Sequence, residues 1–117
     1  MYYVFLAQGF EQLEALAPVD IMRRAEIEVY TVGVGGKVVT SSHNTPVVAD
    51  VMDSEICPDR DCEGIILPGG MPGTLNLENS DVVQKAIDYC VKNDKYIATI
   101  CAAPSIPLRV IVAIPSR

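Results

Sequence analysis

The sequence is poor in basic residues and contains no cluster of them. Its 117 residues include 9 Lys plus Arg against 15 Asp plus Glu, which gives a formal net charge of −6 at pH 7. Nucleic acids and anionic membranes attract basic surfaces, so an acidic chain without a Lys/Arg run favours neither. We therefore expect no nucleic-acid partner and no membrane partner.

Long apolar runs are also absent. The first run, within MYYVFLAQGF, is about six or seven residues long and has no basic leader before it, so it predicts neither a signal peptide nor a membrane span. We expect a cytoplasmic protein. In that reducing compartment the four cysteines, Cys57, Cys62, Cys90 and Cys101, should remain thiols.

Histidine is almost missing, which argues against a structural metal site. His43 is the only histidine, and Cys57 and Cys62 lack the close paired spacing of zinc ligands. We therefore expect no metal. His43 lies in the polar stretch SSHNT and is a weak candidate for catalysis.

Short apolar runs alternate with glycine- or acid-bearing loops and amphipathic stretches, with no internal repeat or linker. This alternation predicts one α/β domain with a mostly parallel sheet. Strands are expected at 2–6, 27–34, 64–67 and 96–100, and helices at 11–25 and 81–93. Residues 38–40 and 46–49 are expected to pair as a hairpin, and MDSEICPDRDCE to form a loop or a short helix.

Several positions refine this prediction. Pro18 lies inside the first expected helix, so that helix either bends there or begins there. GVGGKVV lacks the last glycine of a dinucleotide-binding fingerprint and leads into a strand, which favours a glycine turn over a nucleotide site. Ser80 suits the N-cap of the second helix, and Cys90 falls on its apolar face.

Three chemically useful features directly follow apolar strands. Glu11 and Glu14 follow the first strand, PGGMPG follows the strand at 64–67, and Cys101 follows the last. Parallel strands end at the same edge of a sheet, where doubly wound folds bind ligands. The three features should therefore meet there.

These residue types suit nucleophilic catalysis. A thiol at the start of a helix, as expected for Cys101, is stabilised as thiolate by backbone N–H groups. Gly70, beside Gly69, and Ala102 could each offer a backbone N–H to an oxyanion. Glu14 could donate a hydrogen bond to the sulfur or move protons if it faces inward. The plainer alternatives are an inert buried cysteine, a solvated glutamate and a simple tight turn.

The stretches LAQGFEQLEALAPVDIMRRA, IILPGGMPG and IATICAAPSI resemble the ThiJ/PfpI superfamily. The resemblance runs from Met1 to about Ile106. It implies a flavodoxin-like three-layer α/β sandwich, usually a homodimer, with no metal or organic cofactor. It also implies that Cys101 is the reactive nucleophile, that Glu14 is its acidic partner, and that Gly70 and Ala102 supply the oxyanion hole, with Gly69 and Glu11 in support.

After Ile106 the resemblance stops. The superfamily continues with the helix after the cysteine, further strands and helices, and usually a histidine near the thiol, whereas this sequence reads PLRVIVAIPSR. Pro107 should break that helix. We therefore expect a family-like domain at 1–106 that lacks its C-terminal elements, and an atypical tail at 107–117.

The resemblance implies glyoxalase- or deglycase-like chemistry on small reactive carbonyls such as methylglyoxal, with Cys101 attacking the aldehyde. Two alternatives stay open at this point. The protein could be a redox sensor or chaperone-like stress protein whose thiol oxidises without turnover, or an inactive fragment of the fold.

Overall fold

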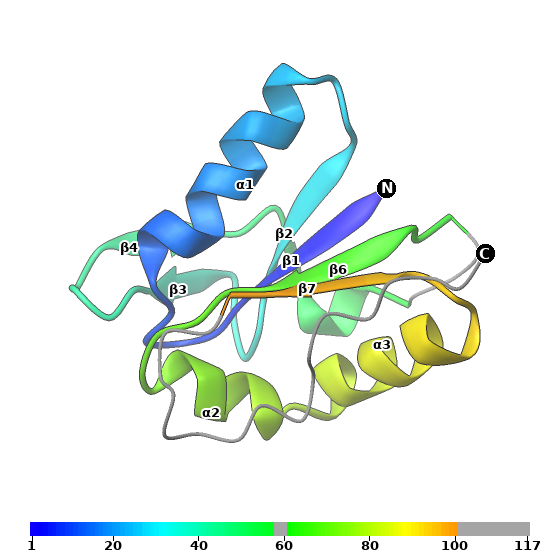
Figure 1. Ribbon diagram of the computed structural model, residues 1–117. Helices are drawn as coiled ribbons and strands as arrows, with labels where there is room; N and C mark the ends of the chain where they lie inside the picture. The colour runs from blue at the N-terminus through cyan, green and yellow to red at the C-terminus, as the bar shows by residue number, and fades with distance from the viewer. Residues whose placement is uncertain (58–60, 101–117) are drawn as a thin grey trace.

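The computed structural model describes residues 1–57 and 61–100. Five parallel strands form the main sheet in the order β5 (Val51–Met52), β2 (Val29–Gly33), β1 (Tyr2–Leu6), β6 (Gly64–Leu67) and β7 (Tyr96–Thr99). The first strand of the chain therefore lies in the middle of the sheet (Figure 1). The expected 107–117 tail lies outside the described residues, and the proposed domain boundary stays a prediction.

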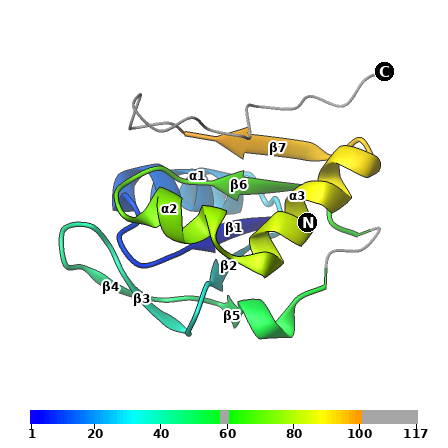
Figure 2. The same cartoon turned by 90° about the horizontal axis from the view of Figure 1, so that it is seen from below.

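Helices cover both faces of this sheet. Helix α1 (Gln12–Arg24) lies on one face, and α2 (Gly73–Glu78) and α3 (Asp81–Lys92) lie on the other, as Figures 1 and 2 show. This arrangement confirms the predicted three-layer α/β sandwich with a mostly parallel sheet.

The core is divided in the same way, because successive strand residues point to opposite faces. In β1, Tyr3 and Phe5 belong to the cluster that packs against α2 and α3, whereas Val4 and Leu6 belong to the cluster that packs against α1. Phe5, Val4 and Leu6 are fully buried. A strand that is buried on both faces in this way explains the continuous apolar run YVFL in the sequence.

Helix α1 begins before Pro18, so the alternative that it starts at the proline is wrong. The Glu11 side chain caps the helix by accepting a hydrogen bond from the backbone N–H of Leu13 at 3.3 Å. Ala15 and Val19 pack into the core from either side of Pro18. Tertiary burial thus holds the helix through the position of the proline.

The segments between the strands agree with the remaining predictions in outline. Strands β3 (Val38–Thr40) and β4 (Pro46–Val48) pair as the expected antiparallel hairpin, and residues 53–55 form a short 3-10 helix. Gly35 occupies a left-handed turn with φ +84°. The sequence pattern did not predict the two-residue strand β5 or the six-residue helix α2.

Helix α3 begins as predicted. The Ser80 hydroxyl accepts a hydrogen bond from the Val83 backbone N–H at 3.3 Å, which identifies Ser80 as the N-cap. Val83, Ala86 and Cys90 are buried on the face toward the sheet. The assignment of Cys90 to the core is confirmed.

Asp50 ties the segment before β5 to β2 and α1. Its Oδ2 accepts hydrogen bonds from the Thr31 backbone N–H at 2.8 Å, the Thr31 hydroxyl at 3.1 Å and Arg23 Nη2 at 2.6 Å. Burial alone would raise the pKa of the Asp50 carboxyl, but the bonds from Thr31 and Arg23 outweigh it, and the pKa lies below its usual value.

We expect Asp50→Asn to destabilise the fold at neutral pH by about 1–2 kcal/mol, because Thr31 and Arg23 lose an ionised acceptor. Because the pKa of Asp50 is lower in the folded state, its ionised carboxylate stabilises the fold fully at pH values above its unfolded-state pKa, about 3.9. This stabilisation is lost as the pH falls through the folded-state pKa. In urea unfolding, the difference in the free energy of unfolding between wild type and Asp50→Asn should therefore be constant from pH 5 to 7 and become smaller below pH 4. Asp20→Asn, which breaks the exposed pair with Arg24, should change little at any pH.

Candidate functional site

The carboxyl ends of β1, β6 and β7 meet at one edge of the sheet, because the three strands are parallel neighbours. Glu11 and Glu14 follow β1, and Gly69 and Gly70 follow β6. The Ile100 backbone N–H, directly after β7, donates to the Leu67 carbonyl at 3.2 Å. The predicted convergence at this edge is therefore confirmed for the features that the structure describes.

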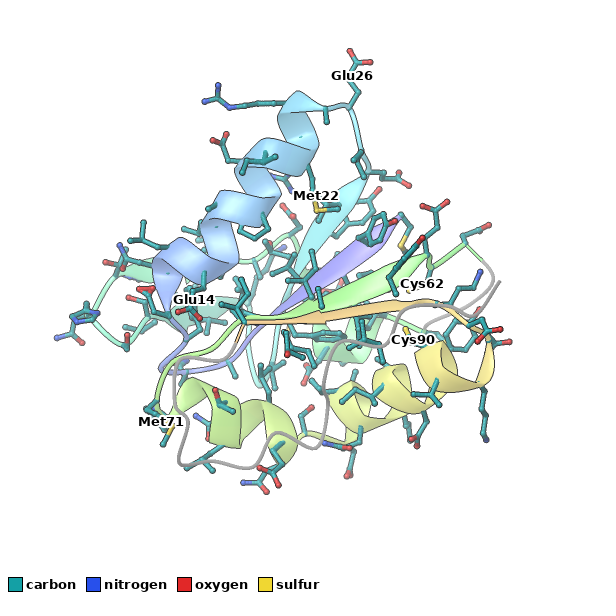
Figure 3. All side chains as sticks on the ribbon, in the orientation of Figure 1. Glu14, Met22, Glu26, Cys62, Met71 and Cys90 are labelled. Atoms are coloured by element: carbon teal, nitrogen blue, oxygen red, sulfur yellow. The ribbon has the colours of Figure 1, made fainter. Side chains whose placement is uncertain are left out.

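Glu14 links helix α1 to the loop after β6. Its Oε1 accepts a hydrogen bond from the Gly69 backbone N–H at 3.0 Å, across 55 positions of sequence. The side chain is half-buried and points from the first turn of α1 toward the sheet edge (Figure 3). Glu14 is thus turned toward the predicted site, and its second oxygen has no recorded partner among the described residues.

Glu11 lies next to this contact and holds both the loop after β6 and the start of α1. Its backbone N–H donates to the Gly69 carbonyl at 2.9 Å, while its carboxylate caps α1 through Leu13. Both backbone polar groups of Gly69, its N–H and its C=O, are therefore bound by residues at the start of α1. This pairing fixes the loop after β6 relative to Glu14.

Gly70 adopts a conformation that side chains rarely adopt. Its φ is +103°, and a Cβ there would lie 2.5 Å from the Glu11 backbone nitrogen. The Thr74 backbone N–H and hydroxyl both donate to the Gly70 carbonyl, at 3.0 and 2.9 Å. Among the described residues no acceptor is found for the N–H of Gly70, which is itself buried.

Two residues at this site were missed by the sequence reasoning. Thr74 holds the Gly70 carbonyl, and Gly9 lies where the loops after β1 and β6 touch, with the Gly73 N–H donating to its carbonyl at 3.2 Å. Gly9 left a signal, since a glycine in the loop that follows a strand allows a close backbone approach. Thr74 left none, because its contact depends on how the loop folds.

The remaining candidates have different outcomes. Cys101 and Ala102 lie outside the described residues, which end at Ile100, and their roles stay predictions. His43 is exposed, and its Nδ1 lies 3.2 Å from the Ser42 hydroxyl.

Neither a metal cluster nor a membrane-spanning helix is found in the part of the chain that the structure describes. Residues 1–57 and 61–100 contain no group of three or more His, Cys, Asp or Glu side chains placed to hold a metal ion. No helix within these ranges has the length and apolar character to cross a bilayer.

Comparison with known proteins identifies the family. The model of the DJ-1/PfpI family matches residues 2–112. The chain is 36% identical to the Parkinson disease protein 7 homolog of Danio rerio, over 87% of this chain and 54% of that protein. It is also 36% identical to the protein/nucleic acid deglycase HchA of Staphylococcus aureus, over 50% of this chain and 20% of the relative.

The fold agrees with these matches. The crystal structure of Drosophila melanogaster DJ-1beta superposes with a TM-score of 0.82 at 30% identity, over 89% of this chain and 56% of that one. This chain spans about half the length of the two DJ-1 relatives. Since the family model covers nearly all of the sequence and the fold superposes on a DJ-1 crystal structure, this chain belongs to the DJ-1/PfpI family.

Proposed function

We propose that this protein acts on small reactive carbonyls, with methylglyoxal as the type substrate, through a covalent adduct at Cys101. The thiolate attacks the aldehyde carbon, and the carbonyl oxygen becomes an oxyanion held by the backbone N–H groups of Gly70 and Ala102. Glu14 moves the proton between the adduct and solvent. No metal or organic cofactor takes part.

The observation that carries this proposal is the contact between Glu14 Oε1 and the Gly69 N–H. It fixes one carboxylate beside the turn whose next N–H, that of Gly70, has no recorded acceptor in the described residues. The Ile100 N–H bond to the Leu67 carbonyl brings the chain to the same edge one residue before Cys101. The deglycase name of the HchA relative supports carbonyl-derived substrates.

The direct test is consumption of methylglyoxal by the purified full chain, followed against buffer and heat-denatured protein. Turnover beyond one equivalent supports the proposal. Saturation at one equivalent would contradict turnover, and the protein would then be a thiol that reacts once. In that case selective oxidation of Cys101 by mild peroxide would favour the redox-sensing alternative.

We expect Glu14→Gln to lower kcat by about a hundredfold or more while the fold is retained. The amide oxygen of Gln still accepts the Gly69 hydrogen bond, but the side chain no longer takes up or releases a proton. Initial rates and urea unfolding, measured on the same preparation, separate the two effects. The matched control is Glu28→Gln, at the opposite end of the sheet just before β2, which should leave the rate within about twofold.

If Glu14→Gln lost activity because the variant was largely unfolded under the assay conditions, the result would contradict a proton-transfer role for Glu14. It would show that the residue acts only by fixing the two loops. A rate unchanged in Glu14→Gln would remove the carboxyl from the mechanism altogether.

We further propose that the protein is a cytoplasmic homodimer. Helix α1 supports the dimer, because Leu13, Ala17 and Ile21 form an exposed apolar stripe at helical spacing, with Leu13 73% and Ile21 65% exposed. The three described cysteines are free thiols, which suits a reducing compartment. A sedimentation mass equal to one chain at micromolar concentration would contradict the dimer.

A further inference from the structure

Two thiols meet inside the protein at the end of the sheet opposite the candidate site. Cys62 lies just before β6, and Cys90 lies in the last turns of α3. Both are completely buried in the same core cluster. The two thiols interact with each other, and Figure 3 shows them between β6 and α3.

The surroundings of the two thiols differ. Cys62 stands between two exposed residues, Asp61 and Glu63, so it is the one buried side chain of a short surface segment. Its Sγ also lies 3.6 Å from the Gly64 carbonyl, to which it donates. Cys90 is fixed within a regular helix. Local opening of the 61–63 segment would therefore expose Cys62 to solvent before Cys90.

We propose that Cys62 and Cys90 form an intramolecular disulfide when the protein meets a small-molecule disulfide such as oxidised glutathione. The two thiols already interact within one buried cluster, and the bond requires the sulfurs to close to about 2.05 Å. The proposal concerns a site separate from Cys101 and does not depend on the proposed carbonyl chemistry.

The exchange proceeds in two balanced steps. The Cys62 thiolate attacks the small disulfide, forms a mixed disulfide and releases one thiol. The Cys90 sulfur then attacks the Cys62 sulfur and releases the second. Two electrons pass from the protein sulfurs to the small disulfide, and the two protein protons end on the released thiols. The hydrogen bond to Cys62 and burial both raise the pKa of the Cys90 thiol, which disfavours it as the first nucleophile.

The disulfide would close a covalent loop of the chain that includes part of the candidate site. The chain between residues 62 and 90 contains β6, the Gly69–Gly70 turn, α2 and most of α3. A disulfide across a ring of this size reduces the freedom of the unfolded chain, so oxidation should raise the urea midpoint by about 1 M or more.

Tryptic mapping tests the proposal directly, because cleavage after Lys and Arg places each cysteine in a different peptide: 38–60, 61–85, 86–92 and 96–109. The reduced full chain is treated with oxidised glutathione, quenched in acid, alkylated in urea and digested without reduction. We expect a cross-link between 61–85 and 86–92, and an intact mass that is about 2 Da lower before alkylation. Cys57→Ser should keep this cross-link, and Cys62→Ser should lose it.

Recovery of 61–85 and 86–92 as alkylated peptides, with glutathione attached only to 38–60 or 96–109, would overturn the proposal. The same oxidation in 8 M urea serves as the folding control. If the native fold directs the pairing, unfolded chains should give several cross-linked pairs and native chains should give one.

Discussion

We expect Cys101→Ser to reduce methylglyoxal consumption by at least about a hundredfold, to the level of the buffer. A serine hydroxyl is not ionised near neutral pH, so it is a poor replacement for a thiolate. Residues that act as a unit lose most of their joint effect when the nucleophile alone is removed. Initial rates at saturating and limiting substrate provide the measurement.

Cys57→Ser is the matched control, because Cys57 is an exposed free thiol that the proposed mechanism does not use. Its rate should remain that of the wild type. Equal rates for wild type and Cys101→Ser would rule out the proposed mechanism, since the remaining consumption would come from surface thiols and amines.

The second large effect is expected at Gly9, where the loops after β1 and β6 touch. A Cβ at Gly9 would lie 2.3 Å from Pro72 Cδ and 2.7 Å from the Pro72 nitrogen, and the residue has φ +85°. Gly9→Ala therefore combines a left-handed backbone with a collision, and we expect it to lower the free energy of unfolding by about 3–5 kcal/mol. Urea denaturation monitored by circular dichroism gives the value.

The chain contains two controls for this experiment. Gly35 has nearly the same φ, +84°, but a Cβ there would have no atom within 4 Å, so Gly35→Ala reports the backbone cost alone, about 1–2 kcal/mol. Gly36 has no positive φ, and a Cβ built there would lie 3.9 Å from its nearest neighbour, the Val38 carbonyl oxygen. Gly36→Ala should therefore leave the free energy of unfolding nearly unchanged. Similar losses at Gly9 and Gly35 would show that the two loops are not tightly packed.

The sequence allowed the main layers to be predicted because their signals are local. The apolar run at Tyr2–Leu6 and the Ser80 cap each need only neighbouring residues to be recognised. Strand β5 was missed because two residues are too few to show an alternation of apolar and polar side chains. Val51 is recognised as a strand residue only by its pairing with Val32. Helix α2 was missed because its six residues are ordered by contacts with Gly70 and by the burial of Leu77.

The candidate site divides in the same way. That Glu14 and the glycine pair would reach one edge followed from parallel topology alone. That Glu14 binds the Gly69 N–H required the positions of two loops separated by 55 residues. Likewise, helical spacing predicted the burial of Cys90, but its partner Cys62 lies in a loop, where no period indicates which way a side chain faces.

The central place of β1 in the sheet has a consequence for biosynthesis. The ribosome makes β1 well before its neighbour β6, which is complete only at Leu67, after β2 to β5 and helix α1 have been made. Until then an apolar segment is exposed to solvent with one hydrogen-bonding edge unpaired, which is the condition that invites aggregation or chaperone capture. Nascent chains of this protein should therefore depend on such protection more than those whose first strand lies at the margin of a sheet.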